Sequence, residues 1–342
     1  MPVGVAFTPF EDRLDVVERG ALLAEQLGLS FVSVAEATGL AAPIALAQLA
    51  CRTERVGLMT GVLSVWSRTP ATLALTAAHL QQLSGGRFVL GLGASTAPVT
   101  EGFHGQPWQS PLGRLRNTCV AIRALLRGER LPAAPDGARP LRMSSPPATP
   151  VPIAVAAVTE PSIRLAGALA DQWLPFLLPA SALEAGRHLI SEAATEGGRA
   201  SGATVTACIP LALGPDHGSA ARLAANWLVS YATKMGPIYP RVLREHGYHR
   251  EIDALLEANP VPGYPVLPPA AQRLAHDVLI FGTYGEAPEV RRRWNQHADS
   301  LALVAPFGVT PDYITDAFEA VAPAGDRADR HGRPSGLDSP GG

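Results

Sequence analysis

Two side chains that could take part in chemistry follow apolar segments of the kind that forms buried strands. Glu36 ends the segment SFVSVAE (30–36), where a carboxylate could donate a proton or anchor a substrate. Trp66 lies in SVWSR (64–68), just after the apolar run RVGLMTGVL, and its ring could stack on a planar group. The structural alternatives are a hydrogen-bond acceptor for Glu36 and core packing for Trp66. We take both as candidate catalytic residues, with Glu36 as proton donor and Trp66 on the substrate side.

A second candidate site lies in AAVTEPSIRLAG (156–167), where an apolar strand runs into a helix. Thr159, Glu160, Pro161 and Ser162 open that helix. Free backbone N–H groups at a helix start, with hydroxyls nearby, favour a phosphate group. Ordinary helix capping requires the same residue types. The segment therefore indicates either a phosphate site or a plain helix N-terminus.

Three other motifs give no support for a functional site. GLGAST (91–96) has Gly91 and Gly93, but Thr96 stands where a dinucleotide fingerprint needs its third glycine, and we reject that interpretation. Ser95 has no GxSxG sequence around it, so a nucleophile elbow is not predicted. His246 and His249 have no third ligand nearby, and no metal site is predicted.

The elements that must position these residues alternate between strand-like and helix-like segments. Most strand segments are apolar without strict alternation, as in parallel sheets that are buried on both faces. Such a chain folds either as a closed (β/α)8 barrel or as an open doubly wound sheet, and eight well-spaced units favour the barrel. The predicted strands are 3–7, 30–36, 55–63, 87–93, 151–157, 172–177, 204–213 and 301–306.

In a barrel, ligands meet the C-terminal ends of the strands. Those ends bring one acid, one tryptophan and several small or hydroxyl residues to one mouth, so residues 64–68 are expected in a pocket wall. The strand ends are Thr8 with its neighbours, Glu36, the segment 61–68, the segment 93–96, the segment 157–160 with Val158, and 176–177.

The chain is predicted to hold one barrel domain over residues 1–322. A helical insertion is expected at about 234–300, before the last strand, and a disordered tail at 323–342, which is polar and rich in glycine and proline. A proline-rich connector at 128–150 shows no periodicity.

Composition excludes several classes of protein. The 342 residues have a formal net charge of −2 and no long basic run, which argues against nucleic acid or anionic membrane as a partner. The three cysteines are far apart and form neither a disulfide framework nor a metal cluster. With no signal peptide and no stretch of about 20 apolar residues, a cytoplasmic protein is expected.

Three segments resemble the bacterial luciferase-like superfamily of flavin- and deazaflavin-dependent oxidoreductases. LSGGRFVLGLG (83–93) is the most specific of them, VPIAVAAVTEPSIRLAGALADQWL (151–174) resembles a second family block, and IFGTYGEAPEV (280–290) resembles a third. The branch most similar to this chain is the one described as coenzyme F420-dependent.

The resemblance implies a (β/α)8 barrel, commonly dimeric, with a cofactor ring in its mouth. The ring would lie against a bulge in the third strand, at Gly61, Val62 and Leu63, often with a non-prolyl cis peptide. Ser95, Thr96 and the segment Thr159 to Ser162 would hold the ribityl and phosphate parts, and Thr8 and Val158 complete the expected cofactor-binding set. Some relatives carry an Asp-His pair where this chain has Glu36-Ala37, which leaves the proton donor open.

The resemblance therefore implies an oxidoreductase that uses F420. Reduced F420 would pass a hydride to an activated C=C, C=N or C=O bond of a small molecule or of a natural-product or peptide intermediate. The single lysine, Lys234, and the abundance of Ala, Gly and Pro suggest a GC-rich gene, which also favours F420. The alternatives are an FMN-dependent monooxygenase and a catalytically silent flavin-binding protein.

Overall fold

Eight parallel strands close into a barrel in the computed structural model, which describes residues 1–131, 137–261 and 263–323. The last barrel strand closes the ring by pairing with the first, Val3 beside Leu301, and with its other neighbour, Thr206 beside Ser300. The predicted (β/α)8 barrel is confirmed, and the open sheet is excluded. The strands are β1 (Val3–Phe7), β2 (Phe31–Val34), β3 (Gly57–Thr60), β5 (Phe88–Gly93), β6 (Ile153–Ala156), β7 (Gln172–Leu174), β8 (Thr204–Gly214) and β10 (Ser300–Ala305).

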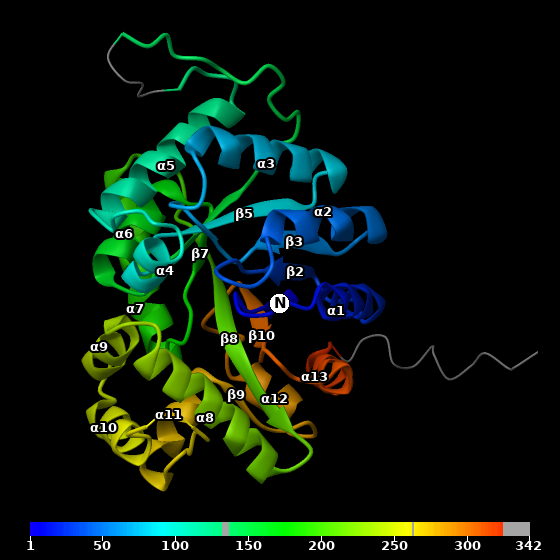
Figure 1. Cartoon of the computed structure of the whole chain (residues 1–342), viewed down its shortest axis with the longest axis vertical. Helices are drawn as coiled ribbons and strands as arrows, with labels where there is room; N and C mark the ends of the chain where they lie inside the picture. Colours follow the sequence, from blue (N-terminus) through cyan, green and yellow to red (C-terminus); the bar gives the residue numbers. More distant parts are fainter. Residues whose placement is uncertain (132–136, 262, 324–342) are drawn as a thin grey trace, which may run out of the picture.

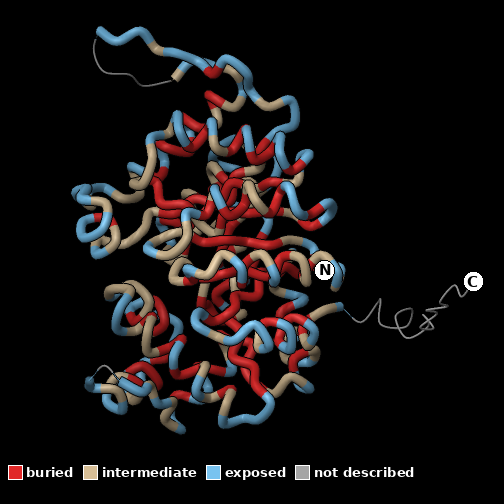
Figure 2. The backbone as a smooth tube through the Cα atoms, turned by 45° about the vertical axis from the view of Figure 1, so that its right-hand side comes forward, coloured by how far each residue is buried: buried red, intermediate tan, exposed pale blue. Residues whose placement is uncertain are grey.

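Helices cover the outside of this barrel (Figure 1). Side chains on both faces of the strands are buried, as their unbroken apolar runs predict, and Figure 2 shows the burial concentrated in the strands and the inner sides of the helices. The covering helices are α1 (Leu14–Gln26), α2 (Ala42–Arg52), α3 (Pro70–Leu83), α5 (Pro111–Leu126), α6 (Glu160–Leu169), α7 (Ala180–Glu196), α8 (His217–Thr233) and α13 (Pro311–Val321).

The segment between α8 and β10 is mainly helical, as expected, and it also contains one short strand that the sequence did not predict. Strand β9 (Ile280–Thr283) pairs in parallel with the second half of β8, Leu211 beside Ile280, whereas the first half of β8 pairs with β10. The long β8 therefore belongs to the barrel at its start and to a side extension at its end. The rest of the segment is helical: α9 (Ile238–Glu245), α10 (His249–Ala258), the 3-10 turn Pro269–Ala271, α11 (Gln272–Val278) and α12 (Ala287–Arg292). Figure 1 places α9, α10 and α11 beside α8, at the lower left.

Two further features concern the connections between strands and helices. The loop after β5 contains a short helix, α4 (Ala97–Gly102), and the third strand continues after a break as β4 (Leu63–Ser64). The described residues of the connector, 128–131 and 137–150, extend from the body at the top of Figure 1. The tail predicted at 323–342 lies outside the described residues, apart from Pro323.

Arg87 explains why the LSGGRFV block is a structural unit. Its guanidinium donates to the carbonyl oxygens of Thr53 and Val56, and its Nε donates to that of Ser84 at 2.7 Å. It thereby joins the end of α2, the start of β3 and the turn before β5. These contacts fix β5 beside β3, which is where the candidate site is built.

Candidate functional site at the barrel mouth

A bulge interrupts the third strand of the barrel between β3 and β4. Leu58 and Met59 pair with Phe88 and Val89, but after the interruption Leu63 pairs with Leu92, so the bulged strand carries one residue more than β5. The peptide bond between Gly61 and Val62 is cis, where the resemblance implied one. The backbone at Gly61, Val62 and Leu63 therefore turns away from a regular ladder at the carboxyl end of the strand.

Side chains and glycines of the neighbouring strands hold this bulge. The Thr60 hydroxyl donates to the Gly91 carbonyl at 2.9 Å and accepts from the Gly91 N–H at 2.7 Å, in place of backbone ladder bonds. A Cβ at Gly91 would lie 1.9 Å from the Thr60 carbonyl oxygen, and one at Gly93 would lie 2.7 Å from a methyl carbon of Val62. A Cβ at Gly61 would meet the Ser33 hydroxyl. The glycines of GLGAST therefore give the bulge room, and no phosphate is needed to explain them.

Glu36 is attached to the bulge through its backbone, and its carboxylate is bound by Arg68. The Glu36 N–H donates to the Val62 carbonyl at 3.2 Å. Arg68 donates to both carboxylate oxygens, at 2.5 and 3.0 Å, and the Ala42 N–H donates to one of them at 3.1 Å. In this arrangement the carboxylate accepts three hydrogen bonds, so its geometry is that of an acceptor.

Trp66 forms part of a wall beside the end of β5. Its indole N–H donates to the Ala94 carbonyl at 2.9 Å, and the indole of Trp108 donates to the same oxygen at 3.2 Å. The guanidinium carbon of Arg114 lies 5.1 Å from the Trp66 ring centre, so one face of that ring is covered by a cation. Trp108 also ties the loop 96–110 to the strand end.

Left-handed backbone conformations mark two strand ends of the mouth. Ser95, two residues after the end of β5, has φ of 62°, and Leu177, three residues after the end of β7, has φ of 55°. Residues other than glycine rarely adopt this region, and such residues cluster at ligand sites. Thr96, which follows Ser95, is the residue from which α4 begins.

The residues after β6 form a capped helix start. The Ser162 hydroxyl accepts from the Thr159 N–H at 3.0 Å and lies 2.9 Å from the Thr159 hydroxyl. The exposed carboxylate of Glu160 pairs with Arg164 one turn later at 3.1 Å. Capping therefore accounts for both hydroxyls, and the backbone at Glu160, next to Val158 and Pro161, is the part of this segment that could face a phosphate. Thr8 is buried at the end of β1, with its hydroxyl 3.4 Å from the Phe10 N–H.

The inside of the barrel below the bulge is uncharged and lined partly by small side chains. Met59, Ala154 and Leu174 form a buried inner cluster, and the partly exposed Val62, Ala156 and Cys208 pack against it. A planar, largely apolar ring fits such a surface better than a charged group does. In the described part of the chain, no three His, Cys, Asp or Glu side chains come together as a metal site requires.

Arg68 lies in the segment 64–68 that the sequence places in the pocket wall, and only its contact with Glu36 was not predicted. Sequence reasoning missed four other residues of this region, namely Trp108, Cys208, Tyr231 and Tyr239. Trp108 lies in the loop after β5, close to predicted residues. Tyr231 and Tyr239 belong to helices that are distant in sequence from every predicted site residue, and no local signal marks them.

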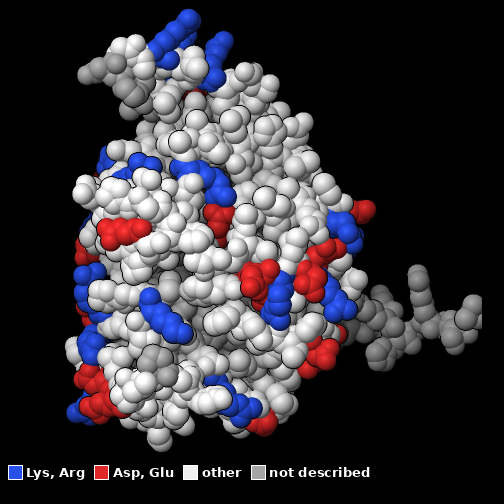
Figure 3. All heavy atoms as spheres, viewed as in Figure 1, with Lys and Arg blue, Asp and Glu red and all other residues white. Residues whose placement is uncertain are grey.

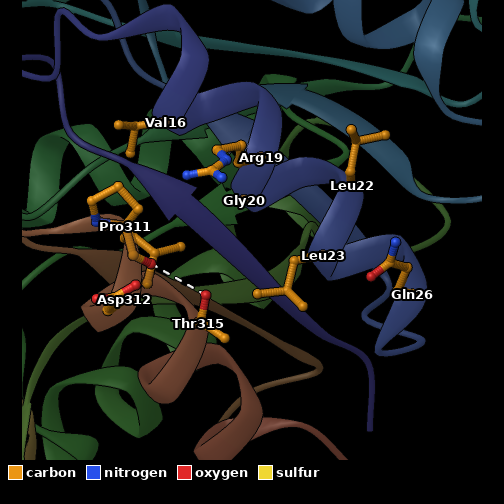
Figure 4. Close-up of a pocket in the computed structure, with 10 residues that line it drawn as sticks. Val16, Arg19, Gly20, Leu22, Leu23, Gln26, Pro311, Asp312 and Thr315 are labelled. Atoms are coloured by element: carbon orange, nitrogen blue, oxygen red, sulfur yellow. Dashed lines mark hydrogen bonds between the residues drawn. The ribbon is translucent and has the colours of Figure 1, made fainter.

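The structure also has a hollow of about 310 Å³ outside the barrel, between α1 and α13 (Figure 4). Val16, Arg19 and Leu23 of α1 face Asp312 and Thr315 of α13 across it. None of the predicted site residues lines this hollow. The polar strand-end residues thus place the candidate site at the mouth and not here.

The chain is thus a parallel (β/α)8 barrel whose third strand is bulged at the mouth. The family model described as luciferase-like monooxygenase matches residues 1–326, and the chain belongs to this family. The resemblance seen in the sequence is thereby confirmed.

Two relatives carry F420 in their names. A Mycobacterium tuberculosis protein named for coenzyme F420-dependent oxidoreductase activity is 36% identical over 167 residues, which cover 44% of this chain and 48% of the relative. An F420-dependent glucose-6-phosphate dehydrogenase of Beutenbergia cavernae is 33% identical over 232 residues, 60% of this chain and 66% of the relative. The matches thus span about half to two thirds of these relatives.

Solved structures share the fold over nearly the whole chain. The F420-dependent tetrahydromethanopterin reductase of Methanopyrus kandleri has a TM-score of 0.72 at 17% identity, covering 94% of this chain and 99% of that one. The oxygenating component of a diketocamphane monooxygenase of Pseudomonas putida, in complex with FMN, has a TM-score of 0.70 at 18% identity, covering 94% and 97%. At these identities the likeness supports the fold alone.

Proposed function

We propose that this chain is an oxidoreductase that binds coenzyme F420 at the barrel mouth and acts on an activated C=C, C=N or C=O bond of a small molecule. The observation that carries the proposal is the bulge at Gly61 and Val62, held open by Thr60, Gly91 and Gly93 above an uncharged inner cluster. When bound, reduced F420 supplies a hydride. The chain supplies binding, orientation and exclusion of water.

The residues of the mouth take distinct parts in this proposal. Val62 would contact the ring, whereas the side chain of Leu63 is fully buried in the core and only its backbone belongs to the bulge. Ser95, Thr96 and the backbone around Glu160 would hold the more polar part of the cofactor. Trp66 lines the wall beside the ring with its indole N–H already bound to Ala94. Because the Glu36 carboxylate accepts hydrogen bonds from Arg68 and Ala42, we assign Glu36 to positioning Arg68 at the mouth, and the proton comes from another group or from solvent.

The cofactor is tested by titrating the purified protein with F420 and, separately, with FMN, each oxidised and reduced, and following tryptophan fluorescence. Trp66 and Trp108 meet at the mouth, so a ring bound there is expected to quench them. We expect micromolar or tighter binding of F420 and much weaker binding of FMN. Tight binding of FMN alone, with O2 consumption on addition of reduced FMN and substrate, would make the protein a monooxygenase, the second candidate, which the description of the matched family favours. Binding of neither cofactor would contradict the proposal and would favour a catalytically silent protein with the same barrel fold.

We also propose that the protein is a homodimer that pairs through α2 and α3. The sequence of α3 contains no charged residue. Three apolar side chains on these two helices are exposed: Ile44 of α2 is 70% exposed, and Leu75 and Leu83 of α3 are 46% and 50% exposed. Figure 3 shows an almost uncharged surface over α3, in the upper right part of the view. Exposed apolar faces of this kind mark interfaces between proteins.

Leu75→Glu is expected to shift the protein from dimer to monomer in sedimentation velocity, because a carboxylate buried in an apolar interface is strongly unfavourable. Val266→Glu is the matched control, since Val266 lies between α10 and the turn Pro269–Ala271, away from α2 and α3, and is 54% exposed. Its replacement should leave the mass unchanged. A wild-type protein that sediments as a monomer at every concentration would contradict the proposal.

A further inference from the structure

Five side chains from β7, β8 and the helices beside them form an aromatic cluster that the function above does not use. We call Phe176, Cys208, Trp227, Tyr231 and Tyr239 the aromatic cluster. The ring centres of Phe176 and Tyr231 lie 4.8 Å apart, and those of Tyr231 and Tyr239 lie 4.9 Å apart at 89°. Phe176 lies beside Cys208 in a parallel bridge just after β7, so the cluster lies at the strand ends.

Cys208 connects the aromatic cluster to the bulge. Its side chain packs against the inner cluster of Met59, Ala154 and Leu174, as Val62 does, and also against the buried residues around Tyr231. The aromatic cluster therefore packs, through Cys208, against the same inner residues as the bulge. A substrate bound beside Val62 would therefore lie near these side chains.

The hydroxyls of Tyr231 and Tyr239 have no hydrogen-bond partner in the part of the chain that the structure describes. The Trp227 indole N–H donates to the Leu211 carbonyl at 2.9 Å, but neither tyrosine hydroxyl has a hydrogen bond to any described residue. Tyr231 is only 6% exposed, and neither hydroxyl is among the fully buried unpaired atoms, so each keeps contact with open space. A hydroxyl that has no hydrogen-bond partner among the described residues and reaches open space is available to donate to a bound ligand.

The surroundings of these hydroxyls are uncharged. Burial raises the pKa of Tyr231 and of Tyr239, with Cys208 adding to both shifts, and burial raises the pKa of the Cys208 thiol to about 12. No acidic or basic side chain contributes to these pKa shifts. At neutral pH the cluster therefore offers two neutral O–H donors on an aromatic wall, and a phosphate or carboxylate buried there would have no counter-charge.

We propose that Tyr231 and Tyr239 bind the acceptor atom of the substrate, and that they select an uncharged substrate that carries a carbonyl group on an apolar or aromatic body. The reaction of this substrate rests on the proposed function, but the binding of a ketone to the two tyrosines can be measured without the cofactor. Both hydroxyls then donate to the carbonyl oxygen, while Phe176 and Trp227 contact the body of the substrate.

The test measures binding of 2-cyclohexenone and acetophenone to the full chain by isothermal titration calorimetry, with and without F420. Tyr231→Phe and Tyr239→Phe keep the aromatic packing and remove one donor each. We expect each to weaken ketone binding about fivefold, and the double variant more than about tenfold. Tyr264→Phe is the matched control, because Tyr264 is 99% exposed, and it should leave ketone binding unchanged.

The outcomes separate this proposal from the proposed function. Unchanged ketone binding in the double variant, no ketone binding to the wild type, or preferential binding of glucose 6-phosphate would each overturn the tyrosine site. Loss of ketone binding in the variants without any binding of F420 would support the tyrosine site and overturn the F420 assignment. F420 fluorescence, titrated in parallel, is expected to report equal cofactor affinity in all variants.

Discussion

Replacing Gly91 with alanine is expected to lower the free energy of unfolding by about 3 kcal/mol and to abolish cofactor binding at the mouth. The added Cβ would lie 1.9 Å from the carbonyl oxygen of Thr60 and 3.1 Å from its carbonyl carbon. Both are backbone atoms, so no side-chain rotation relieves the contact. The bulge itself has to move, which also breaks the two hydrogen bonds between the Thr60 hydroxyl and Gly91.

Urea denaturation followed by circular dichroism measures the first effect, and titration with F420 measures the second. Gly102→Ala is the control, because a Cβ at Gly102 meets no atom within 4 Å, and it should change neither quantity. If Gly91→Ala folds with wild-type stability and binds the cofactor normally, the assignment of Gly91 to the bulge is wrong.

The barrel could be predicted because its determinants are local. Apolar runs of strand length alternate with helical segments along the chain, and such a pattern leaves few topologies open. Helix α3 shows how local signals set boundaries. Thr69 accepts a hydrogen bond from the Thr72 N–H at 3.2 Å, and Pro70 occupies the first turn, as the sequence predicts.

The features that the sequence did not reveal depend on partners far along the chain. Strand β9 has four residues and becomes a strand only because the end of β8 lies beside it. Arg68 binds Glu36, which lies 32 positions away in the sequence. Trp108 binds the Ala94 carbonyl from a loop, and hydrophobic periodicity does not predict the path of a loop. Tyr231 and Tyr239 follow the apolar pattern of packed helices, and only their position over Cys208 gives their hydroxyls a possible role. Positions of strand ends were thus predictable, whereas hydrogen-bond partners were not.

The pair of Glu36 and Arg68 is expected to show a coupling energy of about 2 kcal/mol in a double-mutant cycle of Glu36→Gln and Arg68→Gln. Both oxygens of Glu36 bind the guanidinium, and the two side chains are only 9% and 23% exposed, so solvent screens them little. Urea unfolding of the four proteins measures the coupling. The exposed pair of Arg127 and Glu129 serves as control and should show no measurable coupling.

Activity then separates positioning from proton transfer. If Glu36 acts by holding Arg68, Glu36→Gln lowers the rate of F420H2 oxidation about tenfold and leaves the shape of the pH–rate profile unchanged, because no titrating group of the reaction has been removed. Arg68→Gln should then give a similar loss, and the double variant should lose little more than either single variant, since residues that act as a unit are not additive. A Glu36→Gln profile that loses one of its limbs would instead make Glu36 the proton donor. The bidentate contact with Arg68 would then have to open during turnover, because a carboxyl group that donates its proton to substrate cannot keep both oxygens on the guanidinium.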